Sequence, residues 1–231
     1  MFFSVTTEST TLRASSELFN FKLSRVIFLA FLIGYMLFAD QSTLMLSILI
    51  SSFIIVLLGI FDDIKPIRAR IKILVHIFVA AILVFYGGLK LTHVEIFNFY
   101  INFGVLSPFI TILIIVSTIN AINLIDGLDG LSSGTCAIFY LTIGIVALLK
   151  GNISVLNITL AFIMLGSTLG FLYHNFYPAS IFSGDSGSMF QGFMIATISL
   201  LGFKTATVIS LFVPILILGI PILDTLFAII R

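Results

Sequence analysis

The chain alternates long apolar stretches with short polar segments, and eight of these stretches have the length of a membrane-spanning helix. About 20 mostly apolar residues cross the hydrocarbon core as an α-helix, which satisfies its own backbone hydrogen bonds. Stretches such as FITILIIVSTINAINLI are too long and too uniformly apolar for the strands of a membrane barrel. The predicted fold is therefore an all-α, polytopic membrane bundle. Its expected spans are residues 22–39, 44–61, 71–87, 106–124, 131–149, 155–173, 187–203 and 206–230.

Composition supports the same class, because 60% of the residues are hydrophobic, 9% are charged and the mean hydropathy is +1.26. So little polar surface cannot cover a soluble globule. Residues 1–21 lack the apolar core of a signal peptide and are expected to be a polar cytoplasmic segment. Residues 22–231 are expected to form the transmembrane domain. In the segment 88–104, alternating polar and apolar residues predict a small β-hairpin.

The basic residues predict the orientation, because Lys and Arg in short loops favour the cytoplasmic side. When alternate connections are assigned to two faces, one face has only Lys90, Lys150 and Lys204. The other face has eight basic residues, which are Arg13, Lys22, Arg25, Lys65, Arg68, Arg70, Lys72 and Arg231. Both termini are therefore expected in the cytoplasm, together with eight of the ten acidic residues. An acidic cytoplasmic rim on a lipid-embedded protein indicates a binding site.

The first chemical segment is FDDIKPIRARIK, residues 61–72, where an expected span ends in two adjacent acids followed by four basic residues. Adjacent carboxylates repel each other, so their site should include a cation, a shared proton or nearby basic side chains. The basic residues interleave with isoleucines and are suited to holding a lipid phosphate at the headgroup boundary. The simpler alternative is a helix-end acid pair beside a positive-inside anchor.

The second segment is NAINLIDGLDGLSSG, residues 120–134, in which Asn120, Asn123 and Asp126 recur every three residues. This spacing places the three on one side of a helix end, where they predict a polar cavity. The glycines that follow allow backbone amides to approach a ligand, and the next helix begins with an anion-favouring N-terminus. Phosphate or diphosphate is the expected ligand. An ordinary Asx-and-Gly turn between two helices is the alternative.

The third segment is HNFYPASIFSGDSGS, residues 174–188, a loop that leads through Asp185 into another expected span. Its aromatic side chains are suited to stacking on a nucleobase, or to anchoring the loop at the membrane interface. A purely structural alternative is that the side chain of Asp185 or Ser186 caps the helix that follows. The string Gly-Asp-Ser-Gly also occurs around serine-protease nucleophiles, but here it opens an apolar helix.

Taken together, these segments and PILDTLFAIIR at 221–231 resemble the polyprenyl-phosphate N-acetylhexosamine-1-phosphate transferases. The resemblance covers roughly residues 44–231 and includes N-x-x-N-x-x-D-G-x-D-G followed by F-x-G-D-x-G-S. It points to the bacterial branch that starts O-antigen, enterobacterial common antigen or teichoic acid chains, within cell wall and lipopolysaccharide biosynthesis. The translocase that transfers phospho-MurNAc-pentapeptide has similar motifs.

The resemblance implies that HexNAc-1-phosphate, with GlcNAc the expected sugar, passes from a UDP-sugar to undecaprenyl phosphate with release of UMP, using Mg²⁺ or Mn²⁺. By residue-by-residue match, Asn123 and Asp185 are the expected metal ligands. Asp62 and Asp63 are the catalytic candidates, one of which would prepare the lipid phosphate. The expected substrate-binding residues are Lys72, Asp126, Gly127, Leu128, Asp129, Asn175 and Phe182.

The residues present suit phosphoryl transfer, which requires neutralised phosphate oxygens and a nucleophile held in line. Direct attack and a covalent Asp-phosphate route are both compatible with them. The expected location is the bacterial inner membrane, with the site on the cytoplasmic face. The other expected partners are the lipid bilayer and, as one open alternative, a second copy in a homodimer; no nucleic acid is expected.

Two features depart from the family pattern. A Gly-containing motif before the second span has no clear counterpart in residues 1–43, and the chain stops at Arg231, where relatives continue with a His-bearing loop. The domain is therefore expected to be incomplete at its C-terminus. Two other classes remain open, an ion-coupled transporter with inward-facing acids and an inactive family remnant that binds lipid.

Overall fold

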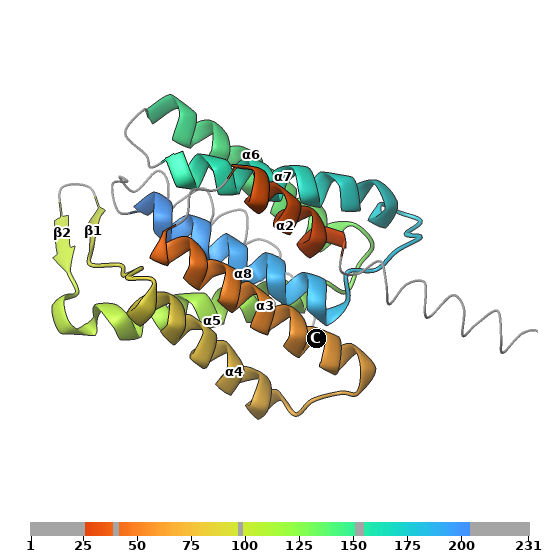
Figure 1. Ribbon diagram of the computed structural model, residues 1–231, viewed down its shortest axis with the longest axis horizontal. Coiled ribbons are helices and arrows are strands. Elements are labelled where there is room, and N and C mark those ends of the chain that lie inside the picture. Colours follow the sequence, from red (N-terminus) through yellow and green to blue (C-terminus); the bar gives the residue numbers. More distant parts are fainter. Residues whose placement is uncertain (1–25, 39–41, 97–98, 151–154, 204–231) are drawn as a thin grey trace, which may run out of the picture.

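Seven long helices account for most of the residues that the computed structural model describes, which are 26–38, 42–96, 99–150 and 155–203 (Figure 1). The helices are α2 (Val26–Phe38), α3 (Thr43–Ile64), α4 (Ala69–Ala81), α5 (Ser107–Ile125), α6 (Leu131–Lys150), α7 (Val155–Asn175) and α8 (Gly184–Phe203). A short π-helix, η1 (Ile82–Tyr86), prolongs α4, and a 3₁₀ turn, η2 (Gly104–Leu106), precedes α5.

Five helical segments are long and apolar enough to cross a membrane, which confirms a mainly helical protein of membrane type. These are Thr43–Ile64, Ala69–Tyr86, Gly104–Ile125, Leu131–Leu149 and Val155–Asn175. The described part of the first expected span is the shorter apolar helix α2, and the expected span 206–230 lies outside the described residues. The count of eight spans and the cytoplasmic placement of both termini therefore remain predictions.

Local sequence explains where several helices begin and end. The Ser42 hydroxyl caps α3 by accepting a hydrogen bond from the amide of Met45 at 3.1 Å. Pro108 lies in the first turn of α5, where the missing amide hydrogen has no helical partner to lose. At the other end of α5, Asp126 leaves helical geometry with φ −74° and ψ 39°, immediately before the glycine-containing turn.

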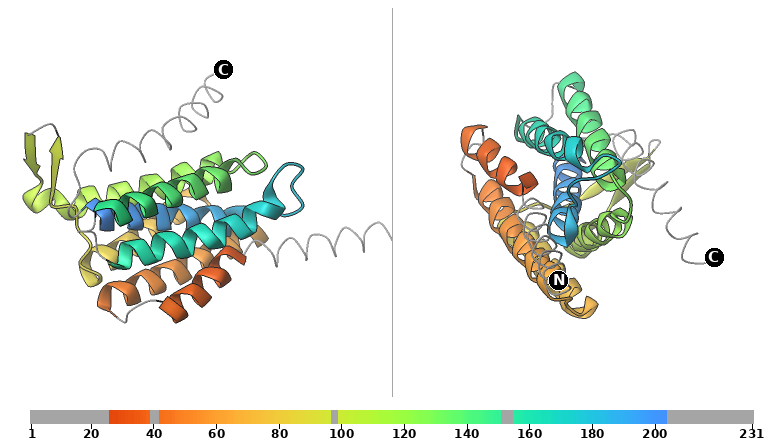
Figure 2. Two further views of the ribbon diagram at one scale, coloured as in Figure 1. Left: turned by 90° about the horizontal axis from the view of Figure 1, so that it is seen from above. Right: turned by 90° about the vertical axis from the view of Figure 1, so that its right-hand side faces the viewer.

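Helix α8 is the central element, and the other helices surround it in the end-on view of Figure 2. Every residue from Ser186 to Ile198 is buried. Its glycines and serines allow close approach of neighbouring backbones, as in other helix pairs that associate within membranes. A methyl group added at Gly192 would lie only 2.8 Å from the Cα of Ile119 on α5. Helix α8 is not one of the five candidate spans, and its side chains meet protein along most of its length.

The outer helices show the complementary pattern, with large apolar side chains on their outward faces. Leu74 and Phe78 of α4, Leu113 of α5 and Ile138 of α6 are all more than half exposed. A soluble protein rarely presents such continuous apolar surface, whereas lipid tails solvate it readily. The exposed faces of these helices therefore suit a lipid environment.

Three connections meet at one end of the bundle, between α3 and α4, between α5 and α6, and between α7 and α8 (Figures 1 and 2). The opposite end has the two-stranded antiparallel sheet of β1 (His93–Ile96) and β2 (Phe99–Asn102), in which His93 pairs with Asn102. The predicted hairpin is confirmed. The three chemical segments of the sequence all lie at the first end.

The close contact between α5 and α8 leads to a stability prediction. Gly192→Ala should destabilise the bundle by about 1–3 kcal/mol, because backbone atoms of α5 cannot move aside for the added methyl group. The melting temperature can be measured by heating the protein with a maleimide dye, which reacts with the buried free thiol of Cys136 once unfolding exposes it. Gly170→Ala is the matched control, since a methyl group there has nothing within 4 Å. Equal melting temperatures for both variants would contradict the close packing.

Candidate active site

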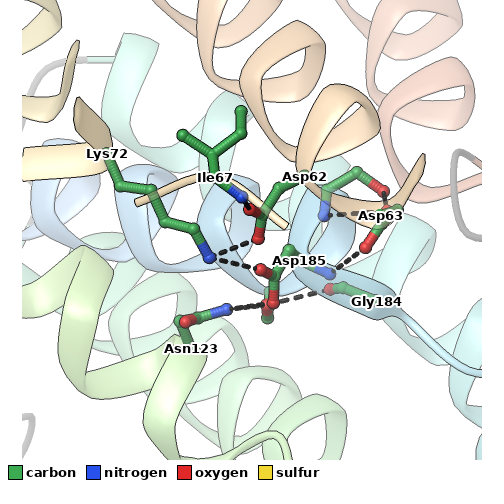
Figure 3. Close-up of polar contacts among 9 residues, drawn as sticks. Asp62, Asp63, Ile67, Lys72, Asn123, Gly184 and Asp185 are labelled. Carbon is green, nitrogen blue, oxygen red and sulfur yellow. Dashed lines mark hydrogen bonds and ion pairs between the residues drawn. The ribbon is translucent and has the colours of Figure 1, made fainter. Parts of the chain in front are cut away.

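One lysine ammonium lies between two carboxylates that come from different parts of the sequence (Figure 3). Lys72, in the first turn of α4, forms an ion pair with Asp62 at the end of α3. Its Nζ atom also lies 2.8 Å from Asp185 Oδ2, at the start of α8. This arrangement confirms that the segment 61–72, with its two adjacent acids, and the segment 174–188, with Asp185, meet in space.

Asp62 is held from two sides and is only 7% exposed. Its Oδ1 atom accepts a hydrogen bond from the backbone amide of Ile67 at 2.6 Å, across the turn that follows α3. Its other oxygen contacts Lys72. The side chain therefore both closes the turn between α3 and α4 and contributes negative charge to the cluster.

Asn123, in the last turn of α5, holds the other oxygen of Asp185. Its Nδ2 atom donates to Asp185 Oδ1 and to Ser188 Oγ, both at 2.9 Å. Asn120, one turn earlier, is exposed and donates to the Val116 carbonyl of its own helix. The predicted polar side of α5 is therefore only partly correct, because Asn123 reaches the cluster and Asn120 does not.

The first turn of α8 is capped from a distance. Asp63 Oδ1 accepts from the amide of Asp185 at 2.8 Å, and Asp63 Oδ2 accepts from the Ser186 hydroxyl at 2.9 Å. The alternative that the Asp185 side chain caps this helix is wrong, and the Ser186 hydroxyl donates to Asp63. The capping carboxylate is in α3, and the Asp185 carboxylate is directed toward Lys72 and Asn123 instead.

A cavity of about 190 Å³ opens beside this cluster. Its lining residues are Asn123, Asp126, Gly127, Leu128, Asp129, Asn175, Phe182, Ser183, Gly184 and Asp185. Eight of these ten were predicted for the site from the sequence. Of the other three predicted residues, Lys72 and Asp63 contact Asp185 directly. Lys72 joins Asp62 to Asp185, so the structure brings all eleven together.

The loop between α7 and α8 is folded around the cavity by two polar contacts. Asp129 Oδ2 accepts a hydrogen bond from the amide of Ala179 at 3.1 Å, and Asn175 Nδ2 donates to the carbonyl of Ile181 at 2.8 Å. Phe182 is 54% exposed at the edge of the cavity. An exposed aromatic ring beside a polar cavity gives a flat ligand group a surface on which to stack.

Asp126, which lies just after the end of α5, has a strongly perturbed pKa. Burial raises its pKa to about 6, although a hydrogen bond from the Ser183 hydroxyl acts in the opposite direction. The negative charges of Asp185 and Asp63 raise it further. A carboxyl group with a pKa near neutrality in a cavity is a common feature of binding and catalytic sites.

The donor atoms fit a hard divalent cation that binds together with a phosphate ligand. The Asp185 carboxylate supplies anionic oxygens, and the described residues give no hydrogen bond to the Asn123 Oδ1 atom. No group of three or more His, Cys, Asp or Glu residues suited to a metal occurs within the described ranges. Mg²⁺ commonly binds through one or two carboxylates, with waters and substrate phosphates completing its shell.

Three residues that shape the site were not predicted from the sequence, namely Ser183, Gly184 and Ser188. Ser183 donates to Asp126, and Ser188 accepts from Asn123. A signal for Ser188 was present, because residues three apart in a helix share a face and Ser188 follows Asp185 by three. No sequence signal indicated the bond between Ser183 and Asp126, which are far apart in the chain.

The raised pKa of Asp126 predicts a pH-dependent stability. Between the ordinary value of 3.8 and about 6, the unfolded chain loses this proton while the folded chain keeps it. Stability therefore falls as the pH rises through this range, by about 3 kcal/mol in total. Asp126→Asn should thus stabilise the protein at pH 7.5 and not at pH 4, as measured by circular-dichroism melting in EDTA. An equal shift at both pH values would rule out a buried charge as the cause.

Comparison with known proteins agrees with this geometry. Residues 45–203 match the model of glycosyl transferase family 4, and this range contains all eleven predicted site residues. A Bacillus subtilis protein, named as a probable undecaprenyl-phosphate N-acetylglucosaminyl 1-phosphate transferase, is 45% identical over 82% of this chain and 53% of its own length. The phospho-N-acetylmuramoyl-pentapeptide-transferase of Moorella thermoacetica is 34% identical over 87% of this chain and 66% of its own length.

A shorter match is to the decaprenyl-phosphate N-acetylglucosaminephosphotransferase of Mycobacterium leprae, 43% identical over 30% of this chain and 20% of the relative. The chain thus spans about half the length of the Bacillus relative. The apolar helices and these membrane-enzyme relatives together identify a multi-pass membrane protein. Because the family model matches well over half of the chain, including the whole site, this protein belongs to glycosyl transferase family 4.

Proposed function

We propose that this protein transfers an N-acetylhexosamine-1-phosphate group from a UDP-sugar to undecaprenyl phosphate and releases UMP. GlcNAc-1-phosphate is the proposed group. The observation that carries this proposal is the Asp185 carboxylate, held between Lys72 and Asn123 at the edge of an acid-lined cavity. The names of the Bacillus and Mycobacterium relatives support a prenyl-phosphate acceptor and an N-acetylglucosamine phosphate donor.

In the proposed reaction, an oxygen of the lipid phosphate attacks the sugar-bearing phosphorus of the UDP-sugar. The new bond gives a lipid diphosphate, and the bond to the UMP oxygen breaks, so that UMP leaves with the electron pair. A lipid phosphate is already largely ionised near neutral pH, so holding it in line matters more than removing a proton. Phosphoryl transfer of this kind depends mainly on positioning and charge neutralisation.

The residues have distinct proposed tasks in this reaction. Asp185 and Asn123 would hold Mg²⁺ or Mn²⁺, which neutralises diphosphate oxygens and stabilises the departing UMP. Lys72 supplies positive charge between Asp62 and Asp185, where the lipid phosphate would meet the donor. The proposed contacts to the nucleotide sugar are the remaining cavity residues, Asp126, Gly127, Leu128, Asp129, Asn175 and Phe182.

The proposed setting is the cytoplasmic face of a bacterial inner membrane, at the first step of a cell-envelope polysaccharide. The excess of basic residues at the site end supports this orientation, because Lys65, Arg68, Arg70 and Lys72 all lie in or next to the turn between α3 and α4. The position of the acids at one end of the helices, together with the acid-lined cavity, favours an enzyme over an ion-coupled transporter, whose site normally lies midway along its helices.

The activity itself is the first test. Purified protein in nanodiscs should release UMP from UDP-GlcNAc only when undecaprenyl phosphate and Mg²⁺ are both present. Asp185→Asn should lower the rate more than about 100-fold, since even outer partners of a metal site account for 10- to 100-fold. No UMP release by the wild type, or an unchanged rate in the variant, would remove the proposal. Ion flux in liposomes without UMP release would favour the transporter. If neither ion flux nor UMP release is observed, an inactive family remnant would be favoured.

Two asparagines on α5 provide a matched pair for the metal role. Asn123→Ala should raise the Mg²⁺ concentration for half-maximal rate by about 10- to 100-fold, because it removes both a ligand oxygen and the bond to Asp185. Asn120→Ala removes an exposed amide that bonds only its own helix, so its Mg²⁺ dependence should match the wild type. If the two variants respond alike, Asn123 has no special role.

A further inference from the structure

The two adjacent acids at the end of α3 have separate surroundings. Asp62 contacts Lys72 and the amide of Ile67, whereas both oxygens of Asp63 are bound to the first turn of α8 (Figure 3). Neighbouring residues on an α-helix point about 100° apart, so one pair of acids can serve two different partners. The structure therefore distinguishes the tasks of Asp62 and Asp63, although the two acids form one motif in the sequence.

The first turn of helix α8 is capped by a side chain from another helix. The first amides of a helix lack helical partners, and a Ser, Thr, Asp or Asn just before the helix normally supplies the acceptor. Here Gly184, with φ +60°, has no side chain, and the preceding Ser183 hydroxyl donates to Asp126 across the cavity. Asp63 fills this role from α3, accepting from the amides of Asp185 at 2.8 Å and Ser186 at 3.4 Å.

Close packing fixes the capping carboxylate in place. A methyl group at Gly59, one turn before Asp63, would lie 2.3 Å from the Cα of Ser186. A methyl group at Gly184 would lie 2.9 Å from Asp63 Oδ1. The backbones of α3 and α8 therefore touch at Gly59, and the Asp63 carboxylate packs against Gly184, so neither the carboxylate nor the helix end can shift independently.

We infer that Asp63 is a positioning residue, which holds the first turn of α8 so that the Asp185 carboxylate meets Lys72 and Asn123. Asp62 is then the member of the pair that faces the acceptor phosphate. This inference deepens the proposed function and rests on it for the role of Asp62. The capping role of Asp63 does not depend on any activity.

Hydrogen–deuterium exchange tests the cap directly in the full-length protein in nanodiscs. In Asp63→Ala, the peptide that contains residues 182–190 should exchange faster by roughly 2- to 30-fold, the range expected from loss of a helix N-cap. Asp63→Asn should restore part of the protection, because its amide oxygen still accepts one hydrogen bond. Asp62→Asn should leave this peptide unchanged. Equal exchange in Asp63→Ala and the wild type would overturn the inference.

Metal binding separates positioning from a direct chemical role. Mn²⁺ binding, measured by electron paramagnetic resonance without substrates, should weaken about 10- to 100-fold in Asp63→Ala, as expected when a supporting residue of a metal site is lost. Gly59→Ala should have the same effect without removing a charged group, and Gly134→Ala, with open space around it, should not. Unchanged Mn²⁺ affinity in both Asp63→Ala and Gly59→Ala would overturn the inference.

Kinetics complete the distinction. High Mg²⁺ should restore most of the kcat of Asp63→Asn, whereas the loss in Asp62→Asn should persist at every Mg²⁺ concentration. A kcat defect in Asp63→Asn that no Mg²⁺ concentration relieves would show that Asp63 acts on the substrate. Absence of UMP release by the wild type would refute the proposed function alone, because exchange and Mn²⁺ binding would still report on the cap.

Discussion

The site depends on how four carboxylates, two of which share one ammonium group, are accommodated at the end of a buried helix. Asp62, Asp63, Asp126 and Asp185 each have specific donors, and Lys72 serves two of them. A carboxylate left without such partners in partly buried surroundings would cost several kcal/mol. Because the acids outnumber the ammonium, the cluster has excess negative charge. That excess favours a divalent cation, with phosphate oxygens completing its shell.

Much of this arrangement follows from the sequence by simple physical reasoning. Long apolar stretches predicted the helices, since hydrocarbon tolerates little else, and counting those stretches placed the acids of three distant segments at one end. The hairpin followed from alternating polarity near His93. The family resemblance named eleven residues, and the structure gathers all of them. Their chemical roles remain predictions, because proximity alone does not assign a role.

Other features could not be predicted, because they arise from contacts between distant parts of the chain. Spacing on α5 grouped Asn120 with Asn123, but only the tertiary packing shows that Asn120 faces outward. Hydropathy likewise placed α8 among the spans without showing that it is the centre of the bundle. Small residues are the signal in retrospect, because they allow α8 to approach its neighbours at Gly59 of α3 and at its own Gly192.

The central position of α8 links the stability of the bundle to the chemistry of the site. A helix surrounded on all sides has few ways to move, so its first turn is a rigid place from which to direct Asp185. That turn is capped by Asp63 from α3, the same helix end that directs Asp62 toward Lys72. The distance between Asp62 and Asp185 is thus set by one short segment of backbone. An adjacent pair of acids is therefore suited to building a phosphate site between two packed helices.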